Sequence, residues 1–117
     1  MLISYPAIFY YDEKDGVPGY FIHFPDFDAA GTQGTSIEEG MEMASDWLGI
    51  HVAHYFEENE VPPKPSNVND LSPEKNNPFA NDEGYDFVYD KRKSFVTLVA
   101  VDLKGCFRSF EKGKYEA

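Results

Sequence analysis

The stretch Leu-Ile-Ser-Tyr-Pro-Ala-Ile-Phe-Tyr-Tyr at residues 2–11 is rich in β-branched and aromatic side chains that partly alternate, which predicts a β-strand. A second run, Tyr-Phe-Ile-His-Phe at residues 20–24, follows a polar segment at 12–19 that contains glycine and proline. Together these runs predict a β-hairpin with a long tip. Because proline cannot donate a ladder hydrogen bond, Pro6 is expected near the start of its strand or facing an edge.

A helix is predicted after a short third strand at residues 29–33. Ser36 and Glu39 have the spacing of a capping box, in which the serine hydroxyl binds the Glu39 amide and the glutamate side chain reaches back. The helix should end around residues 57–59, because the proline-rich segment 61–65 cannot continue it.

Apolar residues recur at helical spacing in this segment, so one stripe of the helix should face a core. The stripe comprises Ile37, Met41, Ala44, Leu48, His51, Val52 and Tyr55. Four acids lie outside it: Glu38, Glu42, Asp46 and Glu57. Gly40 is expected to weaken the helix by about 1 kcal/mol relative to alanine.

The rest of the chain is a polar insertion followed by one strong strand. Residues 64–93 are rich in Asn, Pro, Ser and Asp and predict a long loop, with a short strand at 85–89. Residues 94–103 are apolar on both faces, which is typical of a central strand. Residues 105–117 read as a polar tail. The order of elements predicts an α+β fold, with one main helix on a small mixed sheet, in a single domain spanning residues 1–104.

Charge is distributed very unevenly along the sequence. The first 63 residues carry 12 acids and a single base, Lys14, whereas the remaining 54 carry nine of each, so the net charge of −11 sits in the first half. An acidic surface repels nucleic acid, which is bound through Lys and Arg. It attracts basic partners and speeds encounter with them. The alternative is that the acids only confer solubility.

Catalytic and metal-binding patterns are weak, and no metal, cofactor or catalytic residue is predicted. Three carboxylate clusters could bind Mg²⁺, but each lies in a predicted turn or loop, where Asp commonly caps the backbone. They are Asp12/Asp15, Asp26/Asp28 and Asp82/Glu83/Asp86/Asp90. The helical spacing of His51, His54 and Glu58 would suit Zn²⁺, yet His51 lies on the apolar stripe. Cys106 is the single cysteine, with no partner for a disulfide and no evident base for catalysis.

The start of the chain has neither a basic region nor the long apolar run of a signal peptide. No stretch reaches the roughly 18 apolar residues that a membrane span requires. A cytoplasmic location is therefore expected.

Several segments resemble, in order and spacing, the N-terminal domain of HicB-like antitoxins from bacterial toxin–antitoxin pairs. These segments are Tyr5–Phe9, Gly19–Asp26, Thr32–Gly34 with the following Ser36–Glu39, and Phe95–Leu103. The resemblance covers roughly residues 5–65 and 94–104. The chain departs from the family pattern at Asp28-Ala29, where Pro-Gly is frequent, and at Gly40, where alanine is usual.

This resemblance implies a partial ribonuclease-H-like βββαβ domain without enzyme activity. Such domains bind and mask HicA, a small basic toxin that cuts mRNA. Full-length relatives usually continue into a segment that binds operator DNA. We recognise no such segment after the last strand, so this chain is not expected to bind nucleic acid directly.

The expected toxin contacts lie at the corner around Pro25 and on the solvent face of the helix. They are Phe24, Asp26, Phe27, Asp28, Glu38, Glu39, Glu42 and Asp46. The acids would attract the Lys and Arg residues of the toxin, and Phe24 and Phe27, if exposed, would be apolar anchors. A homodimer or higher oligomer is also expected, because an unpaired sheet edge invites self-association.

Two other functions remain open from the sequence. The chain could be a solitary interaction or regulatory module that kept the fold without a toxin partner. A nuclease that uses a carboxylate-bound metal is a third reading, which rests on fold analogy alone.

Overall fold

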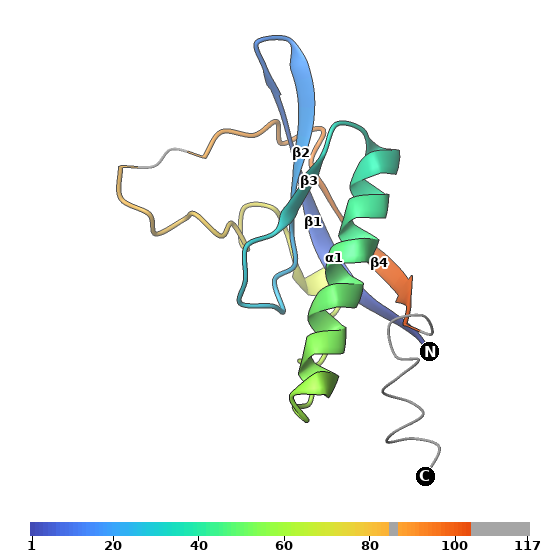
Figure 1. The fold of residues 1–117 in the computed structure, drawn as a ribbon. Helices are drawn as coiled ribbons and strands as arrows, with labels where there is room; N and C mark the ends of the chain where they lie inside the picture. The colour runs from blue at the N-terminus through green and yellow to red at the C-terminus, as the bar shows by residue number, and fades with distance from the viewer. Residues whose placement is uncertain (85–86, 104–117) are drawn as a thin grey trace.

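The computed structural model describes residues 1–84 and 87–103 (Figure 1). In this part of the chain one main helix packs on a four-stranded sheet of order β3-β2-β1-β4. The elements are β1 (Leu2–Lys14), β2 (Val17–His23), β3 (Thr32–Gly34), α1 (Ile37–Glu57), a 3₁₀ turn at Val68–Asp70 and β4 (Phe95–Asp102). The predicted α+β class is confirmed. The sheet is antiparallel at each of its three pairings rather than mixed.

The hairpin is longer and tighter than its sequence predicts. Strand β1 continues to Lys14, which pairs with Val17, so the turn consists of Asp15 and Gly16 alone. Both turn residues have positive φ, at 54° and 76°, as the tight hairpin turns favoured by Asp-Gly require. The expected long tip at residues 12–19 is therefore wrong, because the polar residues on either side of Asp-Gly are strand residues near an exposed end.

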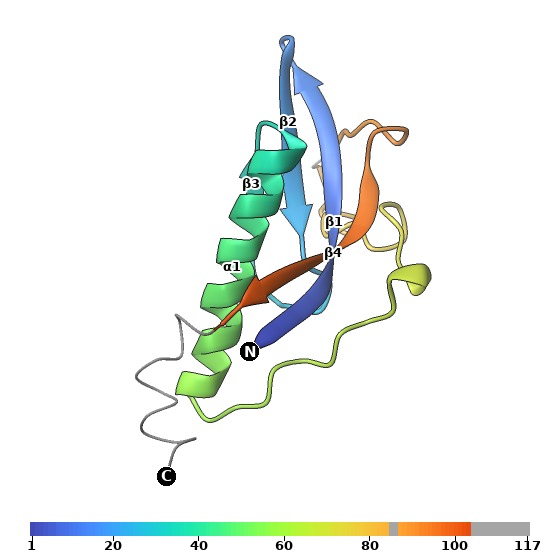
Figure 2. The same cartoon turned by 90° about the vertical axis from the view of Figure 1, so that its right-hand side faces the viewer.

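Strand β1 is the centre of the sheet, and every residue from Tyr5 to Tyr11 is buried. Side chains of a strand alternate between its two faces. Tyr5, Ala7 and Phe9 belong to the core beneath α1, so the intervening Pro6, Ile8 and Tyr10 point to the opposite face. Figure 2 shows α1 on one side of the sheet and residues 60–84 and 87–94 on the other. The sheet is thus covered on both faces.

Strand β4 lies at an edge of the sheet, and its predicted central position is wrong. It pairs with β1 from Leu2 opposite Asp102 to Phe9 opposite Phe95. Its two faces differ, since Val99 is 3% exposed toward the core and Leu98 is 54% exposed on the other face. On α1, the Ser45 hydroxyl donates to the Ala100 carbonyl at 2.8 Å, which satisfies one backbone acceptor of this strand.

The start of α1 follows the predicted capping chemistry closely. The Ser36 hydroxyl accepts a hydrogen bond from the Glu39 amide at 3.1 Å. The Glu39 carboxylate reaches back one residue further than a standard capping box, to the Thr35 amide at 2.8 Å and the Thr35 hydroxyl at 3.2 Å. The helix ends at Glu57, within the predicted range.

The buried face of α1 differs in part from the predicted stripe. Its buried residues are Gly40, Ala44, Leu48, Gly49, Val52 and Ala53. Ile37, predicted to face the core, is 43% exposed. Gly40 lies against Phe9 and Ile22, and a Cβ atom added there would come within 3.0 Å and 3.2 Å of their side chains. The glycine therefore lets α1 pack closely on the sheet. The prediction that Gly40 weakens the helix considered helix propensity alone and did not include this packing.

The second face of the sheet is covered by residues 60–84 and 87–94, here called the covering segment. The prediction of a loop is confirmed, but Phe87–Tyr89 is not a strand, and Tyr85 and Asp86 lie outside the described residues. Three aromatic rings of the segment pack against Tyr10 and Phe21 of the hairpin. The ring-centre distances are 4.9 Å for Tyr10–Tyr89, 5.1 Å for Tyr10–Phe87 and 5.6 Å for Phe21–Phe79.

Hydrogen bonds fix the covering segment at several points. The Tyr10 hydroxyl donates to the Pro73 carbonyl at 2.7 Å, and burial raises the pKa of this phenol, so it stays a neutral donor. The Tyr5 hydroxyl donates to the Pro63 carbonyl. The Asp26 carboxylate accepts hydrogen bonds from the Ser66 amide, at 2.9 Å, and from the Ser66 hydroxyl. A carboxylate of the β2–β3 connection thus holds the covering segment in place.

Replacing Gly40 with alanine should destabilise the protein. Overpacking against Phe9 and Ile22 costs about 1–3 kcal/mol. This exceeds the roughly 1 kcal/mol that alanine gains in helix propensity. We expect the free energy of unfolding, measured by urea denaturation, to fall by about 1 kcal/mol. Gly19→Ala is the control, since its new Cβ meets nothing nearer than 4.0 Å. A more stable Gly40→Ala variant would contradict this packing.

Replacing Asp26 with alanine should loosen the covering segment. Hydrogen bonds to a charged group contribute about 1.5–3 kcal/mol, so urea denaturation should show a loss of that size. Asp28→Ala is the matched control, because Asp28 is an exposed acid two residues away and its loss should change stability by less than about 0.5 kcal/mol. Equal losses of stability in Asp26→Ala and Asp28→Ala would mean that the hydrogen bonds between Asp26 and Ser66 do not stabilise the protein.

Candidate partner-binding surface

The two phenylalanines predicted as apolar anchors are part of the core. Phe24 is 1% exposed and stacks on Trp47 at 4.8 Å. Phe27 is 4% exposed and meets Tyr5 edge-on at 4.8 Å. Their role as anchors was conditional on exposure, and that condition is not met, because the corner after β2 turns both rings beneath α1. Neither ring is available to a partner in this conformation.

The predicted acids divide into those that hold the fold and those that face solvent. Asp26 is bound to Ser66, and Glu39 caps the helix through Thr35. Asp28 is exposed at the corner. The remaining three, Glu38, Glu42 and Asp46, are exposed along α1. None of these three has an ion-pair partner among the described residues, so their charge faces solvent uncompensated.

Two exposed apolar side chains accompany these acids, and sequence reasoning missed them. Met43 is 42% exposed and Ile50 is 67% exposed. They lie seven residues apart, two helical turns, and therefore share one side of α1. We call Glu38, Glu42, Met43, Asp46 and Ile50 the acidic helix face. The sequence could have identified them, because Met43 and Ile50 are apolar residues that fall outside the predicted core stripe of the helix.

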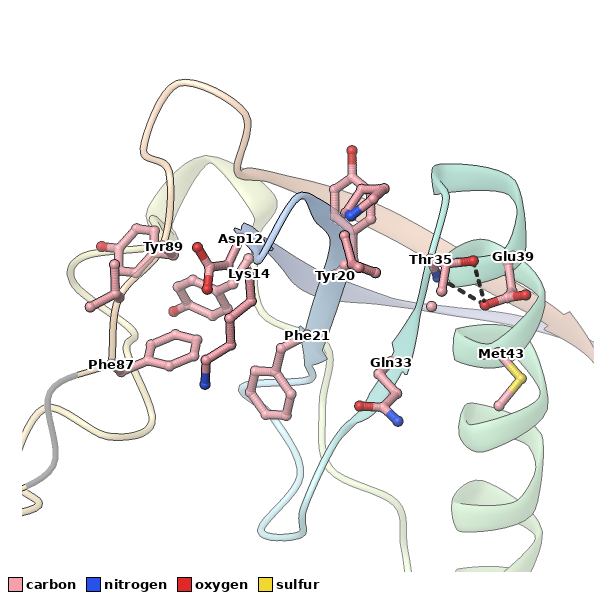
Figure 3. A pocket seen from close by; sticks show the side chains of 16 residues that line it. Asp12, Lys14, Tyr20, Phe21, Gln33, Thr35, Glu39, Met43, Phe87 and Tyr89 are labelled. Atoms are coloured by element: carbon pink, nitrogen blue, oxygen red, sulfur yellow. Dashed lines mark hydrogen bonds between the residues drawn. The ribbon is translucent and has the colours of Figure 1, made fainter.

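A groove of about 860 Å³ opens where β3 ends the sheet (Figure 3). Four parts of the chain line it: the hairpin with Gly19 and Phe21, β3 with Gln33, α1 with Glu39 and Met43, and the covering segment with residues 87–89. It therefore adjoins the acidic helix face through Met43. No local pattern could reveal this groove, because its walls are distant in sequence.

The described residues offer no metal centre. Within residues 1–84 and 87–103, no group of three or more His, Cys, Asp or Glu residues could hold a metal ion. His51 instead stacks on Trp47 at 3.7 Å, and its Nδ1 lies 2.9 Å from the Trp47 carbonyl oxygen. Asp86 and Cys106, considered from the sequence, lie outside the described residues. In the same part of the chain, no helix is both long and apolar enough to cross a membrane.

Comparisons with known proteins identify relatives. A family model described as "HicB_like antitoxin of bacterial toxin-antitoxin system" matches residues 4–72. Antitoxin HicB 1 of Photorhabdus laumondii is 50% identical over 50 residues, which are 43% of this chain and 32% of that protein. Antitoxin HicB of Escherichia coli K12 is 45% identical over 51 residues, 44% of this chain and 37% of that protein. The matched region spans about a third of either curated relative.

Solved structures show the same fold. A chain of a "Toxin-Antitoxin complex from Streptococcus pneumoniae" superposes with a TM-score of 0.86 at 48% identity, covering 91% of this chain and 73% of that one. The antitoxin HicB of Burkholderia pseudomallei superposes with a TM-score of 0.55 at 18% identity, covering 98% and 89%. The family model covers more than half of the sequence. The chain therefore belongs to the HicB-like antitoxin family.

Proposed function

We propose that this protein is an antitoxin that binds a small basic, HicA-like toxin and acts by covering the toxin's RNA-binding surface in the cytoplasm. The observation that carries the proposal is the acidic helix face. It joins unpaired carboxylates to exposed apolar side chains, in a member of the HicB-like antitoxin family. Inhibition of this kind needs binding alone and no catalysis by this chain.

The charge distribution favours such a partner. Carboxylates that face solvent without a cation raise the rate of encounter with a basic protein. The interface also needs desolvated apolar contact, since surface charge pairs contribute little affinity by themselves. Met43 and Ile50 supply it on this face, a role that the buried Phe24 and Phe27 cannot fill.

Self-association would use a different side of the molecule. Leu2 is 72% exposed and Leu98 is 54% exposed, in β1 and in the edge strand β4. Exposed apolar side chains near a sheet edge suit contact with a second copy of the same chain. A dimer formed there would leave the acidic helix face open to the toxin.

Co-expression with the product of an adjacent small gene for a basic protein tests the proposed function. We expect affinity pull-down to recover both proteins, and the toxin's cleavage of RNA to be suppressed in the complex. An active toxin that is neither bound nor inhibited would favour a solitary interaction module instead.

Reversing charge on the acidic helix face should weaken toxin binding. We choose Glu42→Lys/Asp46→Lys, because Glu38 also stabilises the first turn of α1. Loss of electrostatic complementarity should raise the dissociation constant, measured calorimetrically, by at least about tenfold.

Asp82→Lys/Glu83→Lys is the matched control for that variant. It changes net charge by the same amount on the exposed covering segment. The control should bind within about threefold of wild type, because its charges lie away from the proposed interface. Equal weakening by both pairs would mean that overall charge, rather than this face, governs binding.

A further inference from the structure

The groove beside β3 has the size and lining of a specific binding site. Its volume of about 860 Å³ lies within the range of small-ligand pockets. In Figure 3, Phe21 and Phe87 stand on one side and Met43 on the other, with Gln33 between them. These side chains come from the hairpin, the covering segment, α1 and β3, so the groove exists only when all four are in place.

The floor of the groove is open because of Gly19. This residue pairs with Asp12 and shares its face of β2 with Phe21, two positions along the strand. A Cβ atom added at Gly19 would meet only the Asp12 carbonyl oxygen, at 4.0 Å. The position directly above Gly19 is therefore unfilled, at the floor of a groove of about 860 Å³.

Recognition here should rely on side chains rather than on an added strand. Strand β3 covers only Tyr20 to Ile22 of β2, which leaves Val17 to Gly19 without a partner on that side. The middle residue of that free part is Pro18, which lacks an N–H donor. A partner strand would find little to pair with at this edge, whereas a side chain would find an apolar hollow.

The acids at the hairpin and α1 sides of the groove favour a basic partner. The hairpin tip carries Asp12, Glu13 and Asp15 against one base, Lys14. On the opposite wall the groove is lined by Glu39 of α1. The acids therefore lie at the hairpin and α1 sides of the groove, whereas Lys91, Arg92 and Lys93 follow the lining residue Tyr89 on the side of the covering segment.

We propose that this groove receives an apolar or aromatic side chain from a basic segment of the toxin, as the anchor point of the complex. The inference rests on the proposed antitoxin function and deepens it. The expected geometry is the reverse of the one that the sequence predicts: the partner supplies the projecting side chain, and this chain supplies the hollow. A buried anchor in a pocket, with charges at its rim, is the arrangement that concentrates binding energy in protein interfaces.

The test is to fill the groove with Gly19→Phe and to measure the affinity for the basic protein encoded by the adjacent gene. The Cβ atom of the new side chain meets nothing nearer than 4.0 Å, and phenylalanine suits a strand, so we expect the melting temperature not to fall. We expect the dissociation constant to rise at least about tenfold, because the anchor can no longer enter. Ala100→Phe is the matched control, since it adds the same bulk at an exposed position of β4, and it should bind like wild type.

A second variant tests the sign of the electrostatics. Lys14→Ala removes the one base among the described residues that line the groove and should strengthen binding by about two- to fivefold at low salt. Equal affinity of wild type and Gly19→Phe would overturn the groove assignment while leaving the proposed function intact. Failure of the wild-type chain to bind the toxin would overturn both.

Discussion

The burial of β1 on both of its faces is the constraint on which the rest of this structure depends. Seven consecutive residues, Tyr5 to Tyr11, are removed from solvent, and they include four aromatic rings. One helix can cover only one face of such a strand. The second face requires another layer, and here an irregular segment provides it instead of a helix or a sheet. The long insertion therefore covers the second face of the sheet, although none of its described residues is fully buried.

Elements defined by local chemistry were the ones that the sequence could predict. The hairpin follows from its aromatic runs, and the start of α1 follows from Ser36 and Glu39, whose contacts depend on neighbours in the chain. The place of β4 in the sheet could not be predicted in this way, because apolar residues on both faces do not distinguish a central strand from an edge strand. Similarly, Gly40 looks unfavourable until Phe9 and Ile22 are seen against it.

In the candidate interface, too, some features follow from the local sequence and others depend on contacts between residues distant in sequence. Acids along α1 could be located from the helical period, and Glu38, Glu42 and Asp46 are indeed exposed. Which acids are already engaged depends on distant partners, so the role of Asp26 in binding Ser66 could not be foreseen. The buried Phe24 and Phe27 were misjudged for a related reason, since the direction of a corner after a strand is set by what packs beneath it.

The groove adjoins the acidic helix face at Met43, and we propose that one basic toxin covers both. Hydrogen–deuterium exchange of the chain, free and bound to the toxin, tests this account most directly. The account predicts slowed exchange in residues 17–20, 33–35 and 37–50, with no change along β4. Protection confined to β4 and the start of β1 would contradict it and would place the toxin on the opposite edge of the sheet.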